Sequence, residues 1–162
     1  MRVQLKKYKE QDRERLGYLL TNTTIKKTFM IPDFQSEDDL SKMVSKLMEW
    51  SQSDEHYERG IYLESQLIGF VNDVEIEDHT IEVGYVMDPL FWNQGYATES
   101  LQIAIEELFQ MGYEEVCAGA FDENPGSFRV MEKCGMKKIA KTDSILYQGV
   151  EHHCSYYSIV KA

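Results

Sequence analysis

Trp92-Asn93-Gln94-Gly95-Tyr96-Ala97-Thr98-Glu99-Ser100 is a run of nine residues that joins two regular segments through a short turn containing a glycine. The preceding segment, 81–87, is rich in β-branched and aromatic residues and stops at Asp88-Pro89, which predicts a β-strand. The following segment, 96–111, repeats apolar residues at steps of three and four, which predicts a helix with one buried face. Because the start of a helix leaves backbone N–H groups without partners, the run predicts an anion site, most simply for phosphate.

Two common phosphate-binding motifs are absent from this run. A P-loop has a Lys directly after its second glycine, and no Lys follows Gly95. A dinucleotide-binding turn has the pattern Gly-x-Gly-x-x-Gly, and Gly95 is the only glycine between residues 92 and 100. The run is therefore neither a P-loop nor a dinucleotide-binding turn.

The run resembles the pyrophosphate loop of the GNAT N-acetyltransferases, whose signature is Arg/Gln-x-x-Gly-x-Gly/Ala. The last three signature positions agree over residues 95–97, and Trp92 replaces the usual Arg or Gln. Trp at this place, followed by Gly-Tyr-Ala-Thr-Glu, is similar to the branch that contains the ribosomal-protein N-terminal acetyltransferases. A second segment, Asn124 to Gly135, resembles the family's Asn-x-x-Ser-x-Arg-x-Met-Glu-Lys-x-Gly. The resemblance covers the C-terminal half strongly, whereas residues 1–75 agree only in the order of their elements.

The predicted elements fit a single domain over residues 1–162. Helices are predicted at about 11–21, 36–50, 96–111 and 125–134, and strands at about 2–8, 57–64, 66–75, 80–87, 115–121, 136–143 and 152–160. The resemblance implies an α/β (α+β) fold of the GNAT type. This fold has a mixed, mostly antiparallel seven-stranded sheet, flanked by about four helices, in which two central strands splay apart.

Composition narrows the classes of partner. The net charge of −11 disfavours nucleic acid, whose phosphates need a basic surface, and weakly favours cationic partners. No apolar run approaches the roughly 18 residues of a membrane helix, and the first residues lack a signal-peptide core, which predicts a cytoplasmic protein without a membrane partner. Three cysteines without a Cys-x-x-Cys pair favour buried thiols over disulfides or zinc, so no metal is expected. The Tyr-rich C-terminal end is core or dimer surface, which leaves a homodimer open.

The resemblance implies that acetyl-CoA is the co-substrate. Its pantetheine arm would lie between the splayed strands, where Val86 and Met87 present unpaired backbone groups. The backbone of the loop would hold the pyrophosphate through Asn93, Gln94, Gly95, Tyr96, Ala97 and Thr98. Asn124 has two interpretations of equal weight, as the cap that precedes Pro125 at a helix start or as a contact to the cofactor arm.

The acceptor amine must lose a proton before it attacks. An amine with a pKa near 10.4 is largely protonated at pH 7, and removing that proton costs roughly 4 to 5 kcal/mol. Similar enzymes have a Glu in the strand that leads to the loop, so Glu82 is the first candidate base, with Glu75 and Asp73 on the preceding strand in reserve. The alternative interpretation of Glu82 is an ordinary strand carboxylate that faces solvent.

The leaving thiolate needs a hydrogen-bond donor. Many GNAT enzymes use a Tyr seven residues after the motif Asn, and Met131 occupies that position here. The resemblance to the ribosomal-protein branch makes Ser127 the candidate, with a role in the first turn of a helix as its alternative and Tyr147 or Tyr156 as substitutes. The oxyanion formed during the attack is expected at the backbone N–H of Met87.

These residues predict an acetyl-CoA-dependent N-acetyltransferase in which a primary amine attacks the thioester directly in a ternary complex. The acceptor is a peptide or protein N-terminus, a polyamine or a small amine, and the variable segment 21–34 helps to shape its site. A non-catalytic acetyl-CoA-binding or sensing domain is the alternative, because the usual Tyr is missing. A structural or interaction protein that keeps the fold without binding CoA is the third option.

Overall fold

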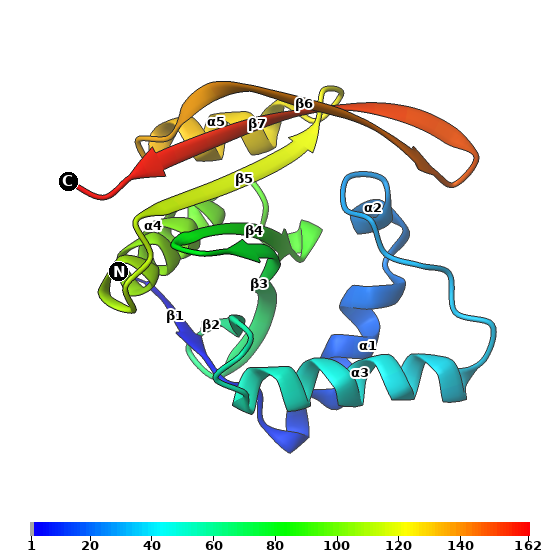
Figure 1. The fold of residues 1–162 in the computed structure, drawn as a ribbon. Helices are drawn as coiled ribbons and strands as arrows, with labels where there is room; N and C mark the ends of the chain where they lie inside the picture. The colour runs from blue at the N-terminus through cyan, green and yellow to red at the C-terminus, as the bar shows by residue number, and fades with distance from the viewer. Residues whose placement is uncertain (1) are drawn as a thin grey trace.

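The computed structural model describes residues 2–162, which form one mixed β-sheet with helices on both faces (Figure 1). The strands are β1 (Val3–Lys6), β2 (Glu58–Leu63), β3 (Gln66–Glu77), β4 (Thr80–Met87), β5 (Glu115–Phe121), β6 (Lys137–Tyr147) and β7 (Val150–Val160). The helices are α1 (Arg13–Thr21), α2 (Thr23–Lys26), α3 (Glu37–Gln52), α4 (Tyr96–Gln110) and α5 (Pro125–Lys133), with short 3-10 turns at Glu10–Asp12 and Pro89–Phe91. In this part of the chain, no helix combines the length and the apolar composition needed to cross a membrane.

The sheet has the strand order β1-β2-β3-β4-β5-β7-β6, and β4–β5 is its parallel pair. That pairing joins residues 80–83 to residues 115–118 and then stops. Beyond it, β4 remains paired with β3 up to Met87, while β5 remains paired with β7 up to Phe121. The predicted seven-stranded, mostly antiparallel sheet with splayed central strands is therefore confirmed.

Two hydrophobic cores lie on opposite faces of the sheet. Ile81, Val83 and Met87 of β4 pack in the core that contains α4, whereas Val86 packs in the core that contains α1, α2 and α3. Successive side chains of a strand point to opposite faces, so Glu82 and Gly84 share the face of Val86. Successive side chains of β4 therefore pack in different cores, on opposite faces of the sheet.

A glycine lies at each end of α4, the helix that the apolar period of 96–111 predicts. Gly95 has φ of +85° and forms the N-cap, and Gly112 has φ of +109° just after the last turn. The N–H of Gly112 donates to the Phe109 carbonyl and the N–H of Tyr113 to the Leu108 carbonyl, the pattern of a Schellman motif. At the other end, Gly95 places the start of the helix next to the β4–β5 gap.

The last two strands are longer than predicted. Residues 144–151 were not expected to be strand, yet β6 and β7 form a hairpin whose turn is Gln148-Gly149. Both turn residues have positive φ, 51° and 77°, as hairpin turns of the primed types require. Gln-Gly is a weaker signal for such a turn than Asn-Gly, so the sequence hides it. The hairpin extends past the end of β5 toward α2 (Figure 1), where the Tyr147 hydroxyl donates to the Lys26 carbonyl at 2.9 Å.

Candidate functional site

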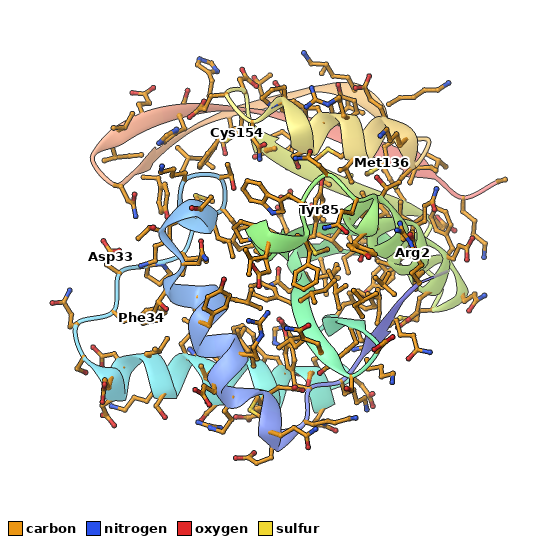
Figure 2. All side chains as sticks on the ribbon, turned by 180° about the vertical axis from the view of Figure 1, so that it is seen from behind. Arg2, Asp33, Phe34, Tyr85, Met136 and Cys154 are labelled. Carbon is orange, nitrogen blue, oxygen red and sulfur yellow. The ribbon has the colours of Figure 1, made fainter. Side chains whose placement is uncertain are left out.

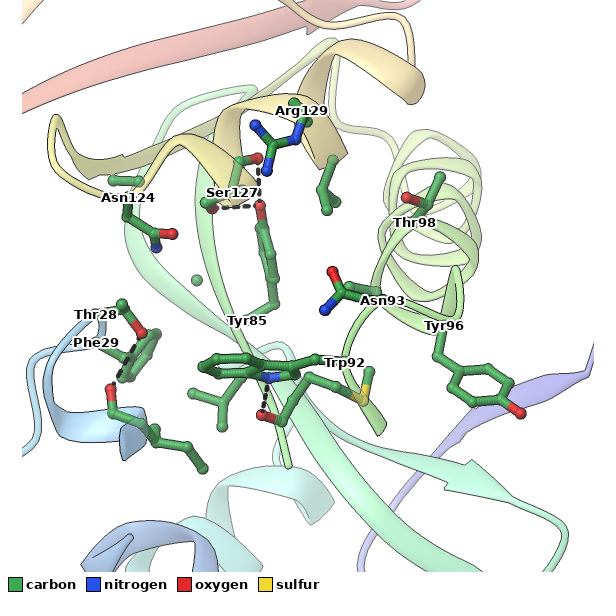
Figure 3. Close-up of a pocket in the computed structure, with 18 of the residues that line it drawn as sticks. Thr28, Phe29, Tyr85, Trp92, Asn93, Tyr96, Thr98, Asn124, Ser127 and Arg129 are labelled. Carbon is green, nitrogen blue, oxygen red and sulfur yellow. Dashed lines mark hydrogen bonds between the residues drawn. The ribbon is translucent and has the colours of Figure 1, made fainter. Parts of the chain in front are cut away.

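A cavity of about 480 Å³ opens where β4 and β5 separate (Figure 3). Nine of the eleven predicted site residues line it: Val86, Met87, Asn93, Gly95, Tyr96, Ala97, Thr98, Asn124 and Ser127. Glu82 and Gln94 are the two that do not. Further lining residues come from the loop after α2, from β5 and from α5, so one cavity collects segments that are far apart in the sequence.

The start of α4 forms one wall of the cavity and is suited to an anion. The Glu99 N–H donates to the Gly95 carbonyl in the first intrahelical bond, which leaves the N–H groups of residues 96–98 without carbonyl partners inside the helix. Arg129 and Lys133, one turn apart on α5, also line the cavity, and neither forms an ion pair with another described residue. Backbone donors and two cations therefore face the same space.

Arg2 holds the outer side of this loop, a role that the sequence does not signal. Its guanidinium donates to the Gln94 carbonyl at 2.8 Å, forms an ion pair with Glu99 and lies 4.4 Å from the centre of the Tyr96 ring. Figure 3 shows the Tyr96 ring directed away from the cavity, toward the N-terminal strand. Gln94 thus contributes its carbonyl to the support of the loop, which explains why it lies outside the cavity lining.

We expect the Arg2→Ala variant to bind CoA more weakly, by up to about tenfold, which corresponds to roughly 1.4 kcal/mol. Without the guanidinium, Gln94 and Glu99 lose their shared partner and the phosphate-facing turn becomes less ordered. Titration calorimetry with CoA measures the change. Arg13→Ala is the matched control, because Arg13 bonds to Ser45 on α3, away from the loop. An unchanged dissociation constant for Arg2→Ala would contradict this role.

The backbone of β4 offers donors to the gap. The N–H of Asp88 donates to the Ile68 carbonyl at 2.7 Å, and donors alternate along a strand, so the N–H groups of Tyr85 and Met87 point toward β5. The expectation for Val86 is wrong in this detail: its carbonyl faces β3, where a Cβ on Gly69 would lie 2.1 Å from it. The Met87 carbonyl is also occupied, because Trp92 Nε1 donates to it at 2.7 Å. Of the backbone groups predicted at Val86 and Met87, the Met87 N–H is therefore the one that faces the gap.

Trp92 has a place in the site that the family signature does not indicate. Its indole bond to Met87 joins the end of β4 to the phosphate-facing loop, and its ring lies across the cavity (Figure 3). Where the family signature has a polar Arg or Gln, Trp92 contributes an aromatic ring that lines the cavity and is hydrogen-bonded to β4.

Two hydroxyl groups meet inside the cavity. The Oη of Tyr85 and the Oγ of Ser127 lie 2.6 Å apart, and the Tyr85 hydroxyl also lies 3.1 Å from the Ser127 carbonyl (Figure 3). Burial raises the pKa of Tyr85 well above its ordinary value, so its proton stays in place. Sequence reasoning did not select Tyr85, because it reads as an ordinary strand residue. Ser127 is consequently hydrogen-bonded to Tyr85 inside the cavity.

The two substitute tyrosines are placed elsewhere, and Met131, at the position of the family's usual Tyr, is fully buried in the core. The hydroxyl of Tyr147 is surrounded by the backbone of the loop after α2 and accepts from the Ile31 N–H, so Tyr147 is wrong as a substitute. Tyr156 is buried behind Gly119, and burial raises its pKa to about 12. Of the hydroxyls that the sequence suggested, the cavity holds that of Ser127.

Asn124 does not cap α5 with its side chain in the described part of the chain. Its backbone joins the turn instead, because its N–H donates to the Phe121 carbonyl and its carbonyl accepts from the Ser127 N–H. The side chain lines the cavity (Figure 3). Asn124 is therefore the N-cap of α5 ahead of Pro125, as expected, but it caps through its backbone, and its side-chain amide faces the cavity.

Glu82 lies beside the cavity and two residues before Gly84, which lines it. Its carboxylate is 15% exposed and pairs with Lys141, whose Nζ lies 3.4 Å from Oε1. Burial raises the pKa of Glu82 above its ordinary value, and Lys141 opposes part of that rise. The carboxyl group is thus prepared to take a proton at a higher pH than an exposed glutamate.

The two reserve carboxylates differ from Glu82. Glu75 lies opposite Glu82 on β3 and is exposed. Asp73 accepts from the Tyr57 N–H at 2.9 Å and pairs with His56 at 3.2 Å, so it stabilises the start of β2 and is wrong as a base. Among residues 2–162 there is no group of three or more His, Cys, Asp or Glu that is suited to a metal ion.

A family model described as an acetyltransferase (GNAT) domain matches residues 2–137. The chain belongs to the GNAT family. YnaD of Bacillus subtilis, named an uncharacterized N-acetyltransferase, is 36% identical over 81 residues, which is 49% of this chain and 48% of YnaD. The chain thus matches about half the length of this curated relative.

Solved GNAT structures share the whole fold at lower identity. The microcin C7 self-immunity acetyltransferase MccE, in complex with acetyl-CoA and AMP, is 20% identical with a TM-score of 0.84, over 99% of this chain and 93% of that one. The ribosomal-protein-S5-alanine acetyltransferase of Vibrio fischeri is 16% identical with a TM-score of 0.81, over 99% and 93%. The neighbours therefore include the ribosomal-protein branch, and at these identities the likeness is one of fold.

Proposed function

We propose that this chain moves an acetyl group from acetyl-CoA to a primary amine by direct attack in a ternary complex. The observation that carries the proposal is the cavity between β4 and β5, which has the N-terminus of α4 at one wall and a partly buried glutamate beside it. A narrow gap followed by a cluster of anion donors matches a molecule with a thin arm and a pyrophosphate. MccE, which shares the fold, was solved with acetyl-CoA.

The residues present fit this co-substrate. The N–H groups of residues 96–98 would hold the pyrophosphate, with Asn93 and Gly95 shaping the turn. Arg129 and Lys133 supply positive charge for further phosphate, and Asn124 is free to bond the amides of the arm. When bound, acetyl-CoA supplies the thioester carbonyl that an amine attacks. The N–H of Met87 is the donor placed to stabilise the oxyanion.

One side chain then accepts the proton of the amine, and a pair of hydroxyls provides hydrogen bonds to the leaving group. Glu82 accepts the proton of the amine, directly or through water, because burial has raised its pKa toward the range in which a general base works well. The Ser127 hydroxyl donates a hydrogen bond to the thiolate as it leaves, and the Tyr85 hydroxyl, which bonds to Ser127, orients it. Glu82 and Tyr85 lie on β4 and Ser127 lies on α5, and both elements border the cavity.

The acceptor belongs to the class of cationic amines: a peptide or protein N-terminus, a polyamine or a small amine. The net charge of −11 favours a positively charged partner, and Glu75 and Asp143 lie near Glu82. The V. fischeri neighbour is named for a protein alanine acceptor. The loop after α2 lines the cavity at Thr28 and Phe29 and is bonded to Tyr147 of the β6–β7 hairpin, so these segments would shape the acceptor site.

Thermal unfolding with acetyl-CoA, followed by a thiol-release assay over a panel of amines, tests this function. Acetyl-CoA at about 100 times its dissociation constant should stabilise the fold by roughly 2.7 kcal/mol. At least one cationic amine should then release CoA. Stabilisation without thiol release for any amine would favour the non-catalytic sensor instead, and no stabilisation at millimolar ligand would reject the co-substrate itself.

A further inference from the structure

Lys141 places its own primary amine at the candidate base. Its Nζ lies 3.4 Å from Glu82 Oε1 and 4.5 Å from the centre of the Tyr156 ring. The carboxylate neutralises the ammonium and the ring face stabilises it by a cation–π contact. An amine held in this way stands where an external acceptor would have to give up its proton.

The backbone of β6 is irregular at this position. Lys138 pairs with Tyr157 and Thr142 pairs with Ser155, so residues 139–141 lie opposite Tyr156 alone. A bulge of this kind interrupts the ladder and redirects side chains, and bulges are frequent next to active sites. Lys141 lies in this bulge, and its Nζ lies over the Tyr156 ring.

The same ring connects Lys141 to the cavity. Tyr156 packs against Gly119 so closely that a Cβ there would lie 2.5 Å from the ring, and Gly119 lines the cavity. Glu82 and Gly84 lie on this face of the sheet, and Gly84 also lines the cavity. The ε-amine is therefore next to the β4–β5 gap, at the end of a flexible side chain that is 48% exposed.

We propose that the chain acetylates its own Lys141, a reaction that rests on the proposed function of the cavity. The ε-nitrogen, after losing a proton through Glu82 to water, forms a bond to the thioester carbonyl carbon. The carbon–sulfur bond breaks, and the thiolate takes the second proton of the nitrogen and leaves as CoA. The products are Nε-acetyl-Lys141, CoA and one released proton. The acetylated side chain is neutral and no longer pairs with Glu82.

The chain contains an internal control for chemical acetylation. Lys42 on α3 also forms an ion pair, with its Nζ 3.3 Å from Asp38 Oδ2, and its side chain is 75% exposed. Uncatalysed acetylation favours the more exposed amine, so Lys42 should react at least as fast as Lys141 if the cavity plays no part. Positioning next to a base predicts the reverse order.

The experiment incubates the full chain with acetyl-CoA and no added amine, and peptide mass spectrometry follows both lysines. We expect acetylation of Lys141 to be roughly a hundredfold faster than that of Lys42, the lower end of what a positioned base contributes. The rate per chain should not change on dilution, as an intramolecular reaction requires. Glu82→Gln should slow Lys141 and leave Lys42 unchanged, whereas Lys141→Arg should remove the fast phase.

Each other outcome overturns the inference. Equal rates at the two lysines would show chemical acetylation, and a rate that falls on dilution would show transfer between chains. External amine turnover with an unmodified Lys141 would reject self-acetylation and leave the proposed function intact. Absence of stabilisation by acetyl-CoA would reject both together.

Discussion

Turnover of a cationic amine by the Glu82→Gln variant is expected to fall about 10² to 10⁴-fold, the usual contribution of a general base. Glutamine keeps the size of the side chain and removes its ability to accept a proton. The dissociation constant for acetyl-CoA should stay the same, because Glu82 does not line the cavity. Steady-state kinetics together with calorimetry separate the two effects.

The pH dependence of the same reaction follows from the burial of Glu82. A base works only when it is deprotonated, and burial raises the pKa of this carboxyl group. The acid limb of kcat/KM should therefore lie above the ordinary range of an exposed glutamate. In Glu82→Gln this limb should disappear from the residual activity.

Glu75→Gln is the matched control, because Glu75 lies directly across from Glu82 on β3 and is exposed to solvent. It removes the same charge from the same region, so it reports the general electrostatic effect on a cationic acceptor. We expect a change in KM with nearly unchanged kcat. Equal losses of kcat in the two variants would show that Glu82 acts through charge alone and has no role as the base.

The local parts of the site are predictable from the sequence because they depend on neighbouring residues. The Gly95 turn and the apolar period of 96–111 fix the start of α4 and its free N–H groups. Alternation along residues 81–87 assigns the two faces of β4, which the two cores then confirm. These features need no knowledge of the rest of the fold.

Contacts between distant segments are what sequence reasoning could not supply. Arg2 reaches the carbonyl of Gln94 across 92 residues, and no local pattern marks it. Tyr85 and Ser127 meet only because β4 and α5 border the same gap. Asn124 precedes Pro125 as the N-cap of α5, as the local pattern predicts, but its side chain lines the cavity and makes no bond to the helix start. That direction depends on the distant segments that form the cavity.

Gly69 is the position where a single methyl group should do the most damage to the gap. The Gly69→Ala variant would place a Cβ 2.1 Å from the Val86 carbonyl oxygen and 3.2 Å from the Met87 Cα. These are backbone atoms in a paired strand, so relief requires β3 and β4 to move apart. We expect a loss of about 3 kcal/mol in the free energy of unfolding, at the upper end of the usual cost of overpacking.

The opposite result is expected for the same substitution at Gly17, within α1. A Cβ there meets Leu40 Cδ2 at 3.6 Å, an ordinary contact, and alanine in a helix is favoured over glycine by roughly 0.5 to 1 kcal/mol. Thermal unfolding should thus separate the two variants, at about 2–4 °C for each kcal/mol in a domain of this size. Because Val86 and Met87 border the gap, Gly69→Ala should also weaken acetyl-CoA binding, whereas Gly17→Ala should not. A Gly69→Ala protein of normal stability and affinity would show that β4 can shift without closing the site, which would separate the cavity from the fixed spacing of β3 and β4.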